Sequence, residues 1–292
     1  MIFNTKPPKI RWLCYFWSMS KHPIGVFDSG YGGLTVLKSL ASMMPEYDYL
    51  YLGDNARAPY GTKDFETVYR YTWEAVHWLF ESGCPLVILA CNTASAKALR
   101  SIQQKELPAY DIQKRVLGVI RPTSEVIGSY TKSGHVGVLG TPGTIESGSY
   151  LIEMAKFFPE LNVSQQACPE WVPLVEANKQ ATEEADYWVE KYIKEIMHRD
   201  DKIDTLLLAC THYPLLMQTI RKFLPDGVSA ISQGGLVASS LLDYLERHEE
   251  IRSQLSTGGE ISFCTTGDVA DFNGHASFFY GKPVEARSVL LK

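Results

Sequence analysis

Short apolar runs alternate with longer helical patterns along the chain after residue 22, and this alternation constrains the fold more than any other feature. The runs have the length of buried strands, and the segments between them have the length and periodicity of helices. The strand-like runs are Ile24 to Phe27, Tyr49 to Leu52, Leu86 to Ala90, Arg115 to Val119, His135 to Leu139, Thr205 to Ala209, Val228 to Ile231 and Ile261 to Thr265. The helical segments are Leu34 to Met44, Phe65 to Ser82, Ala94 to Lys105, Gly148 to Phe158, Thr182 to Arg199, Leu215 to Phe223 and Leu236 to Glu249. The alternation predicts an α/β fold with mainly parallel sheets.

The sequence repeats one plan in its two halves. A strand runs into a glycine turn at Ile24 to Gly33 and again at His135 to Thr144, and a later strand in each half ends in Ala-Cys, at Cys91 and at Cys210. The repeat predicts two similar doubly wound domains with a pseudo-twofold relation and a site in the cleft between them. We expect residues 21–117 with 236–292 to form the first domain and residues 118–235 the second.

Composition excludes several classes of function. The chain has 292 residues and a formal net charge of −5, and its Lys and Arg are scattered, so we expect neither nucleic acid nor a membrane surface as a partner. No apolar run approaches the ~20 residues that span a bilayer. The six cysteines form no CxxC pair, which is typical of a reducing compartment and predicts a cytoplasmic protein.

The first twenty residues stand apart from this pattern. The aromatic stretch from Trp12 to Trp17 follows basic residues as in a signal peptide, but it is too short for an apolar signal core and lacks a small-residue cleavage site. We interpret residues 1–20 as a disordered extension, within which Met19 is an alternative start.

Cys91 and Cys210 are the strongest candidates for chemistry. A single cysteine in an apolar strand is usually inert core. Here both cysteines end a strand, and polar residues that can open a helix follow each: Asn92 and Thr93 after the first, Thr211 and His212 before Pro214 after the second. We expect each thiol to face a helix N-terminus, where backbone N–H groups favour thiolate and can also hold a carboxylate.

Two matched thiols can serve as the two acid–base groups that racemisation at carbon requires. Inversion removes a proton from one face of the stereocentre and returns one to the other face, so a thiolate and a thiol on opposite faces can exchange roles at each turnover. Preorganised donors must stabilise the carbanionic charge. The sequence offers no cofactor motif, and we expect none: the turn Asp28 to Gly33 lacks the spacing of a phosphate loop.

Two further residues keep two interpretations each. Asp28 can assist the site or cap the helix that begins near Leu34. His212, two residues after Cys210, can tune the thiol or fill a core or cap position. Metal ligation by the Cys-Thr-His stretch is not expected, because the usual ligand pairs are absent.

With these residues identified, the chain resembles the glutamate racemases of the aspartate/glutamate racemase superfamily. Six segments carry the resemblance, in order along the chain: FDSGYGGLTVLKSL from Phe27, GDNARAPYGTK from Gly53, ILACNTASAKAL from Ile88, GVLGTPGTIESGSY from Gly137, ACPEWVPLVE from Ala167 and LLLACTHYPLL from Leu206. The resemblance implies two facing α/β domains, the first completed by the C-terminal segment. It also implies glutamate as substrate, no cofactor, and D-glutamate supplied to peptidoglycan; a homodimer is left open.

The resemblance also assigns roles. Cys91 and Cys210 are the implied proton donors and acceptors, and Asp28, Glu176 and His212 match residues that assist them. The implied pocket residues are Asp28, Ser29, Tyr60, Gly61, Asn92, Thr93, Thr211 and His212, with Thr141 and Thr144 matching a threonine pair near the ligand carboxylate. The sequence departs from the family at Ser232-Gln233, where Asp-Ser or Asp-Pro is frequent, and at Asn55, where Thr is commoner.

Three alternatives remain from the sequence. A racemase or decarboxylase of the same superfamily could act on another acid such as aspartate, although the second cysteine argues against a decarboxylase. A thiol hydrolase could use Cys210, His212 and Glu176 as a triad, which leaves Cys91 without a role. A binding module on the same clefted fold would show no turnover.

Overall fold

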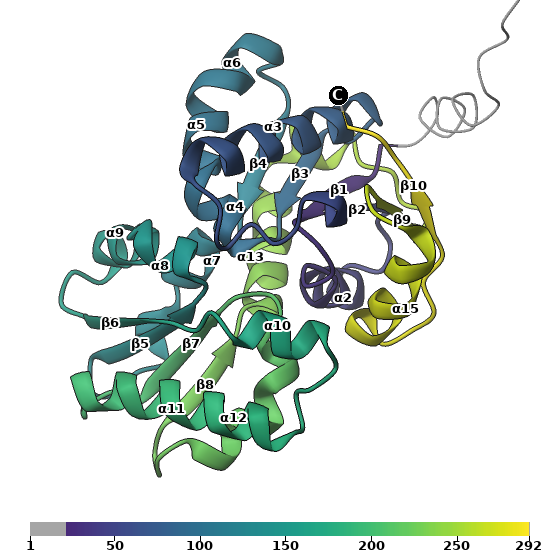
Figure 1. Ribbon diagram of the computed structural model, residues 1–292. Coiled ribbons are helices and arrows are strands. Elements are labelled where there is room, and N and C mark those ends of the chain that lie inside the picture. Colours follow the sequence, from purple (N-terminus) through teal and green to yellow (C-terminus); the bar gives the residue numbers. More distant parts are fainter. Residues whose placement is uncertain (1–21, 292) are drawn as a thin grey trace, which may run out of the picture.

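The computed structural model describes residues 22–291, so the N-terminal extension and the alternative start at Met19 lie outside the described residues. Within them the chain forms two parallel sheets, each in its own part of the molecule (Figure 1). No helix among these residues has the length and apolar character needed to cross a membrane.

The first sheet has six parallel strands in the order β10-β9-β2-β1-β3-β4. Their bounds are β1 Ile24–Asp28, β2 Tyr49–Gly53, β3 Leu86–Leu89, β4 Arg115–Gly118, β9 Ile261–Thr265 and β10 Ala286–Ser288. Every residue of β1, β2 and β3 is buried, as expected for strands covered on both faces by helices. The helices of this part are α2 Leu34–Met43, α3 Phe65–Glu81, α4 Asn92–Lys97, α5 Leu99–Ser101, α6 Leu107–Tyr110 and α15 Val269–Tyr280.

The second sheet has four parallel strands in the order β6-β5-β7-β8. Their bounds are β5 His135–Gly140, β6 Asn162–Ala167, β7 Thr205–Ala209 and β8 Ser229–Ser232. The helices of this part are α7 Ile120–Ser124, α8 Pro142–Glu146, α9 Ser149–Phe157, α10 Trp171–Glu176, α11 Glu183–Arg199 and α12 Met217–Phe223, with a 3₁₀ turn, η4 Tyr213–Leu216, before α12.

The two sheets repeat one strand order, which confirms the common plan predicted from the sequence. The core of the first sheet runs β2-β1-β3-β4 and the second runs β6-β5-β7-β8, so β1 corresponds to β5 and β3 to β7. The glycine turns therefore follow corresponding strands, and each cysteine lies just beyond a corresponding strand end: Cys91 two residues after β3 and Cys210 one residue after β7. The repeat is thus present in topology as well as in sequence.

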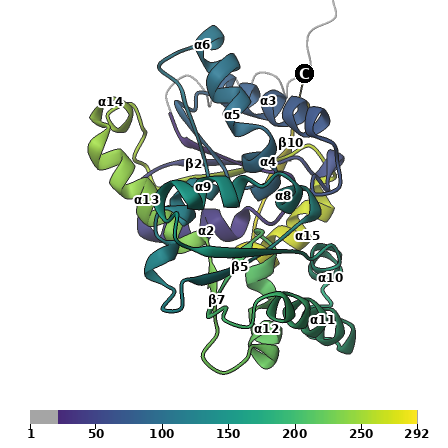
Figure 2. The same ribbon diagram turned by 90° about the vertical axis from the view of Figure 1, so that its left-hand side faces the viewer.

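The chain passes between the two sheets twice. It leaves the first sheet after β4 and enters α7, and it leaves the second sheet after β8 and enters α13 (Gly234–Arg247), which packs on α2 and is followed by α14 (Glu249–Arg252). In both views α2 and α13 lie between the strands of the two sheets (Figure 1 and Figure 2). These two crossings are the only covalent links between the sheets within the described residues.

Several element boundaries differ from the prediction for local reasons. The helix expected over Ala94 to Lys105 begins at Asn92 and divides into α4, α5 and a π-helical stretch over Ile102–Glu106. The helix expected over Leu215 to Phe223 opens as a 3₁₀ turn containing Pro214. The sequence prediction did not name strands β6 and β10, short helices such as α7, α8 and α10, or helix α15, which lies beside the candidate site.

Candidate active site

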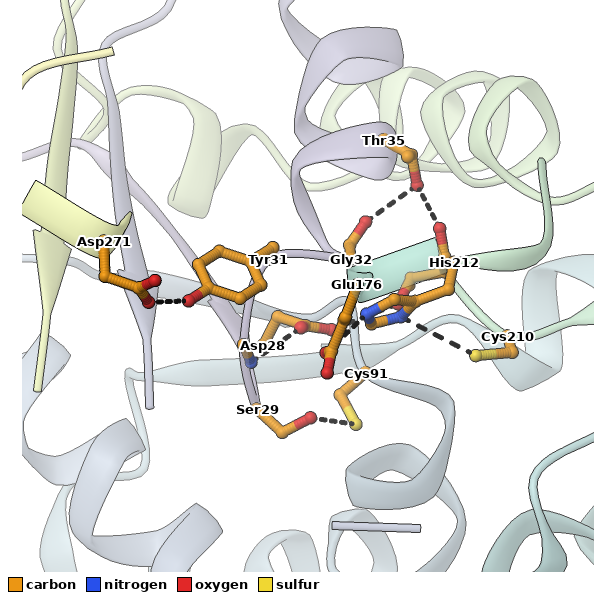
Figure 3. Close-up of polar contacts among 12 residues, drawn as sticks. Asp28, Ser29, Tyr31, Gly32, Thr35, Cys91, Glu176, Cys210, His212 and Asp271 are labelled. Atoms are coloured by element: carbon orange, nitrogen blue, oxygen red, sulfur yellow. Dashed lines mark hydrogen bonds and ion pairs between the residues drawn. The ribbon is translucent and has the colours of Figure 1, made fainter. Parts of the chain in front are cut away.

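Cys91 and Cys210 meet in one buried region between the two sheets. Each is 6% exposed, and the negative charge of Cys210 is among the influences that raise the pKa of Cys91. Figure 3 shows both sulfurs in one cluster with Asp28, Ser29, Glu176 and His212. The region therefore contains the two thiols that the sequence singled out, one from each half of the repeat.

Cys91 is the N-cap residue of α4, as its position in the sequence suggested. Its sulfur accepts a hydrogen bond from the backbone N–H of Ala94 at 3.4 Å and lies 3.5 Å from the Ser29 hydroxyl. Burial is the largest influence on this thiol, followed by the negative charge of Asp28, and together they outweigh these hydrogen bonds and raise the pKa of Cys91 to about 12. The helix N-terminus therefore acts on Cys91 in the expected direction, through the Ala94 N–H, but desolvation outweighs it.

Cys210 has a different environment from that of Cys91. The 3₁₀ turn that follows has His212, not Cys210, as its N-cap residue, so Cys210 does not cap a helix as Cys91 does. Its sulfur instead lies 3.9 Å from Nδ1 of His212. A histidine partner, rather than backbone N–H groups, thus provides the polar contact of this thiol.

His212 connects Cys210 to a carboxylate. Its Nε2 lies 3.0 Å from Oε1 of Glu176, and its ring is 7% exposed. Burial alone would lower the pKa of His212, but the hydrogen bonds to Cys210 and Glu176 and their negative charges raise it to about 10. His212 is therefore an imidazolium near neutral pH, with both ring nitrogens placed to donate.

Asp28 is buried at the end of β1. Its Oδ1 accepts from the backbone N–H of Gly30 at 2.9 Å, and its Oδ2 accepts from the Thr211 hydroxyl at 3.4 Å. Burial raises its pKa, while His212 and the backbone N–H groups of the glycine turn oppose the rise. The N-cap position of α2 belongs to Gly33 and has no side-chain cap bond, so the capping interpretation of Asp28 is wrong.

Three predicted threonines form a hydroxyl triangle across the two halves of the molecule. The Thr93 hydroxyl at the start of α4 lies 3.0 Å from that of Thr141 and 3.4 Å from that of Thr144, and the latter two are 3.0 Å apart. All three are buried. The triangle places adaptable donors and acceptors from both halves next to the cysteine region.

The remaining predicted pocket residues form hydrogen bonds with other parts of the protein. The Tyr60 hydroxyl donates to Asp54, and the Gly61 carbonyl accepts from the N–H of Gly143 at 2.9 Å. The Asn92 side chain bonds to Gln233 and Tyr150. Gly61 therefore lies at a contact between the two halves, and the polar groups of Tyr60 and Asn92 are bonded to other side chains in this structure.

Sequence reasoning missed several residues that support the site. The Thr35 hydroxyl donates to the carbonyls of Gly32 and Thr211, which ties the glycine turn of the first half to the Cys210 loop of the second (Figure 3). Phe279 of α15 packs edge-on against His212, with ring centroids 5.2 Å apart. Asp268 at the N-cap and Gly281 at the C-cap were the signals that could have revealed α15.

Both thiols of the site are almost fully covered, at 6% exposure each. A cavity of about 720 Å³ is lined by residues of α4, α5, α9 and α13 and by neither cysteine. No group of three or more His, Cys, Asp or Glu side chains arranged to hold a metal ion occurs within residues 22–291. Because each cysteine is only 6% exposed, contact of a substrate with both sulfurs requires the residues around them to move.

Comparisons with known proteins agree with this geometry. A sequence model of the Asp/Glu/Hydantoin racemase family matches residues 24–238. The glutamate racemase of Dinoroseobacter shibae is 39% identical over 276 residues, covering 91% of this chain and 98% of the relative. The crystal structure of a glutamate racemase isoform from Bacillus anthracis superposes with a TM-score of 0.83 at 35% identity, covering 92% of this chain and 98% of the other.

Two more solved structures bear on the substrate class. The glutamate racemase of Francisella tularensis, in complex with D-glutamate, matches with a TM-score of 0.82 at 31% identity, covering 93% of this chain and 98% of the other. An aspartate racemase from Picrophilus torridus, at 16% identity and a TM-score of 0.50, covers 79% of this chain and 99% of the other and shares the fold alone. The chain belongs to the Asp/Glu/Hydantoin racemase family and, within it, to the glutamate racemases.

Proposed function

We propose that the chain interconverts L- and D-glutamate by passing the α-proton between Cys91 and Cys210, without a cofactor. The observation that carries the proposal is the placement of the two thiols. They follow corresponding strands of two sheets with the same order, and they meet in one buried region. A stereocentre between them would present its two faces to different sulfurs.

The charges around the thiols suggest how one turnover begins. The raised pKa of Cys91 keeps its proton at neutral pH, so we assign Cys91 as the acid that delivers a proton and Cys210 as its partner in the first transfer. The His212 cation, held by Glu176, can donate to the Cys210 sulfur and stabilise negative charge on it. After the transfer the thiols have exchanged roles, and the reverse reaction uses the same groups in the opposite order.

Asp28 lies on the Cys91 side of the site and supports the reverse direction. Its buried carboxylate, bound to the glycine turn and to Thr211, raises the pKa of Cys91 and so makes that sulfur a stronger base once its proton has been given up. We propose that Ser29, Tyr60, Gly61, Asn92, Thr93, Thr141, Thr144 and Thr211 bind the substrate, together with Asp28 and His212. The hydroxyl triangle and the N–H groups at the start of α4 suit a carboxylate.

The wider setting follows from this activity. We propose that D-glutamate made by this isomerase is used in peptidoglycan synthesis, and that the enzyme works in the cytoplasm. The five cysteines within the described residues are all free thiols, as the chemistry requires. The division into domains at residues 117/118 and 235/236 and the homodimer both stay predictions.

Incubation with L-glutamate in D2O tests the proposal. The desalted enzyme, with no added cofactor, should produce D-glutamate with deuterium at Cα, because the proton that reaches the new face comes from a thiol that exchanges with solvent. Aspartate under the same conditions should react far more slowly. An enzyme that leaves Cα–H of both glutamate enantiomers unexchanged is not a racemase, and a preference for aspartate would move it to another branch of the family.

A further inference from the structure

Gln233 occupies the junction where the chain crosses between the two sheets. It is the residue between β8 and α13, it is 4% exposed, and it belongs to the Ser232-Gln233 pair that departs from the family pattern. As the N-cap residue of α13 it makes no side-chain cap bond. Its amide is directed instead to groups on other elements.

Two of these groups lie on the other segment that crosses between the sheets. One N–H of the Gln233 Nε2 is shared between the Val119 carbonyl, at 3.3 Å, and the Thr123 hydroxyl, at 3.0 Å. Both of these acceptors belong to the other crossing, between β4 and the end of α7. The two covalent links between the sheets are therefore joined by one buried amide. A rotation of one half against the other would pivot at this point.

The same amide closes a ring of hydrogen bonds with Asn92 and Tyr150. Asn92 Nδ2 donates to Gln233 Oε1 at 2.7 Å, Gln233 Nε2 donates to the Tyr150 hydroxyl at 2.6 Å, and that hydroxyl donates to Asn92 Oδ1 at 2.5 Å. Each member donates once and accepts once, so the loss of one member leaves the other two with unmatched groups. Such buried networks are stable only when complete.

The ring reaches the catalytic region through Asn92. Asn92 directly follows Cys91 and is the first residue of α4, Tyr150 lies on α9 in the other half, and all three side chains are buried. The orientation of the Asn92 amide and the start of α4, whose N–H groups contact the Cys91 sulfur, thus depend on the ring.

We propose that Gln233 is a positioning residue that fixes how the two halves close on each other, and with it the separation of Cys91 and Cys210 and the orientation of Asn92. The inference rests on the proposed function for its catalytic consequence. Loss of the Gln233 hydrogen bonds lowers the fraction of enzyme in the closed, competent arrangement, and the apparent affinity for substrate falls in proportion to that fraction. Saturating substrate restores closure, so kcat changes less than KM.

Steady-state kinetics of Gln233→Met and Tyr150→Phe test the positioning role of Gln233. Each variant should raise the KM for glutamate by about fivefold to thirtyfold, the effect of losing one or two buried hydrogen bonds, with kcat within about threefold of the unaltered enzyme. The KM of the double variant should be no higher than that of the more impaired single variant, because either change breaks the whole ring. Exposed matched changes, Gln254→Met and Tyr187→Phe, should leave both constants unaltered.

Hydrogen exchange separates this inference from the proposed function. The amides of α4 and α7 should exchange faster in Tyr150→Phe than in the unaltered protein, whether or not glutamate is turned over. If the unaltered protein does not racemise glutamate but exchange is faster in Tyr150→Phe, the proposed function is wrong and the positioning role of Gln233 stands. Unchanged KM together with unchanged exchange in Tyr150→Phe overturns the positioning role of Gln233, even where Gln233→Met fails to fold. A lowered melting temperature of Gln233→Met with unchanged KM would show that Gln233 only stabilises the core.

Discussion

At the scale of single residues, the site depends on a close approach of the glycine turn to the Cys210 loop. A Cβ atom at Gly32 would lie 2.2 Å from the Thr211 hydroxyl and 2.4 Å from Nδ1 of His212. Real Cβ atoms do not approach other atoms so closely, so a side chain here must push the loop away. The absence of a side chain at residue 32 thus brings His212 close to the first half of the molecule.

We predict that Gly32→Ala lowers kcat/KM by at least ~100-fold, since a displacement of about 1 Å at a reacting group costs a factor of this order. The matched control is Gly274→Ala on α15, where a Cβ meets nothing within 4 Å. Steady-state racemisation of both variants measures the effect. Full activity in Gly32→Ala would show that the Cys210 loop tolerates displacement.

The charge on His212 leads to a dependence of stability on pH. Its pKa is raised from an unfolded value of ~6.5 to about 10, so folding is favoured by its protonation. This contribution is fully present below pH ~6.5 and is lost as pH rises toward 10. It therefore weakens across the neutral to alkaline range.

We predict that the unfolding free energy of the unaltered protein, relative to His212→Gln, declines between pH 6.5 and 10. Urea denaturation at four or five pH values measures the difference, and comparison with the variant cancels the other titrating groups. A difference that stays constant, or that grows with pH, means that His212 is neutral in the folded protein.

At the scale of elements, α15 completes the wall of the site from the far end of the chain. It packs on α2, and Phe279 near its end contacts the ring of His212. Its first turn is capped by Asp268, whose carboxylate accepts from the N–H of Asp271 at 2.8 Å. The tie between Asp271 and the Tyr31 hydroxyl, at 2.5 Å, fixes the same turn to the glycine loop (Figure 3).

We predict that Asp268→Ala lowers the unfolding free energy by about 1 kcal/mol, the usual effect of losing an N-cap. Asp243→Ala, an exposed carboxylate on α13 paired only with Arg247, is the control and should change stability by less than about 0.5 kcal/mol. Denaturant unfolding decides between them. Equal effects of the two substitutions would mean that the cap does not hold α15.

The elements that sequence reasoning identified are those with strong periodicity. Strands such as β3 and β7 are continuous apolar runs, and α11 has both a Thr182 cap and an amphipathic pattern. Strand β6, with the sequence NVSQQA, is mostly polar and half-exposed at a sheet edge, so no apolar run marks it. Strand β10 has only three residues and depends on pairing with β9.

The candidate site was predictable to the level of residue type and place. The two Ala-Cys strand ends identified Cys91 and Cys210, because corresponding parallel strands end on the same edge of their sheets. The protonation of Cys91 was not predictable, since it depends on burial and on Asp28, which lies 63 positions earlier in the chain. Contacts such as Phe279 with His212 join distant segments and leave no local signal.

In the molecule as a whole, the cysteines differ in how completely they are covered. Cys91 and Cys210 are each 6% exposed, whereas Cys84 and Cys168 are 0% exposed. Local opening around the site therefore exposes the first pair more readily than the second pair.

We predict that a small thiol reagent modifies Cys91 and Cys210 faster than Cys84 and Cys168, and that glutamate slows the first two reactions. Peptide mass spectrometry over time measures the four rates in one sample. Equal rates for all four would indicate that modification follows global unfolding and that no opening motion precedes it.

If two thiols act on one stereocentre, each of two single substitutions must abolish the reaction. Racemisation of L-glutamate and of D-glutamate should fall to background in Cys91→Ser and equally in Cys210→Ser, with both proteins folded. A hydrolase built on Cys210, His212 and Glu176 would lose activity only in the second variant. Full racemisation in either variant would mean that the reaction does not need both thiols.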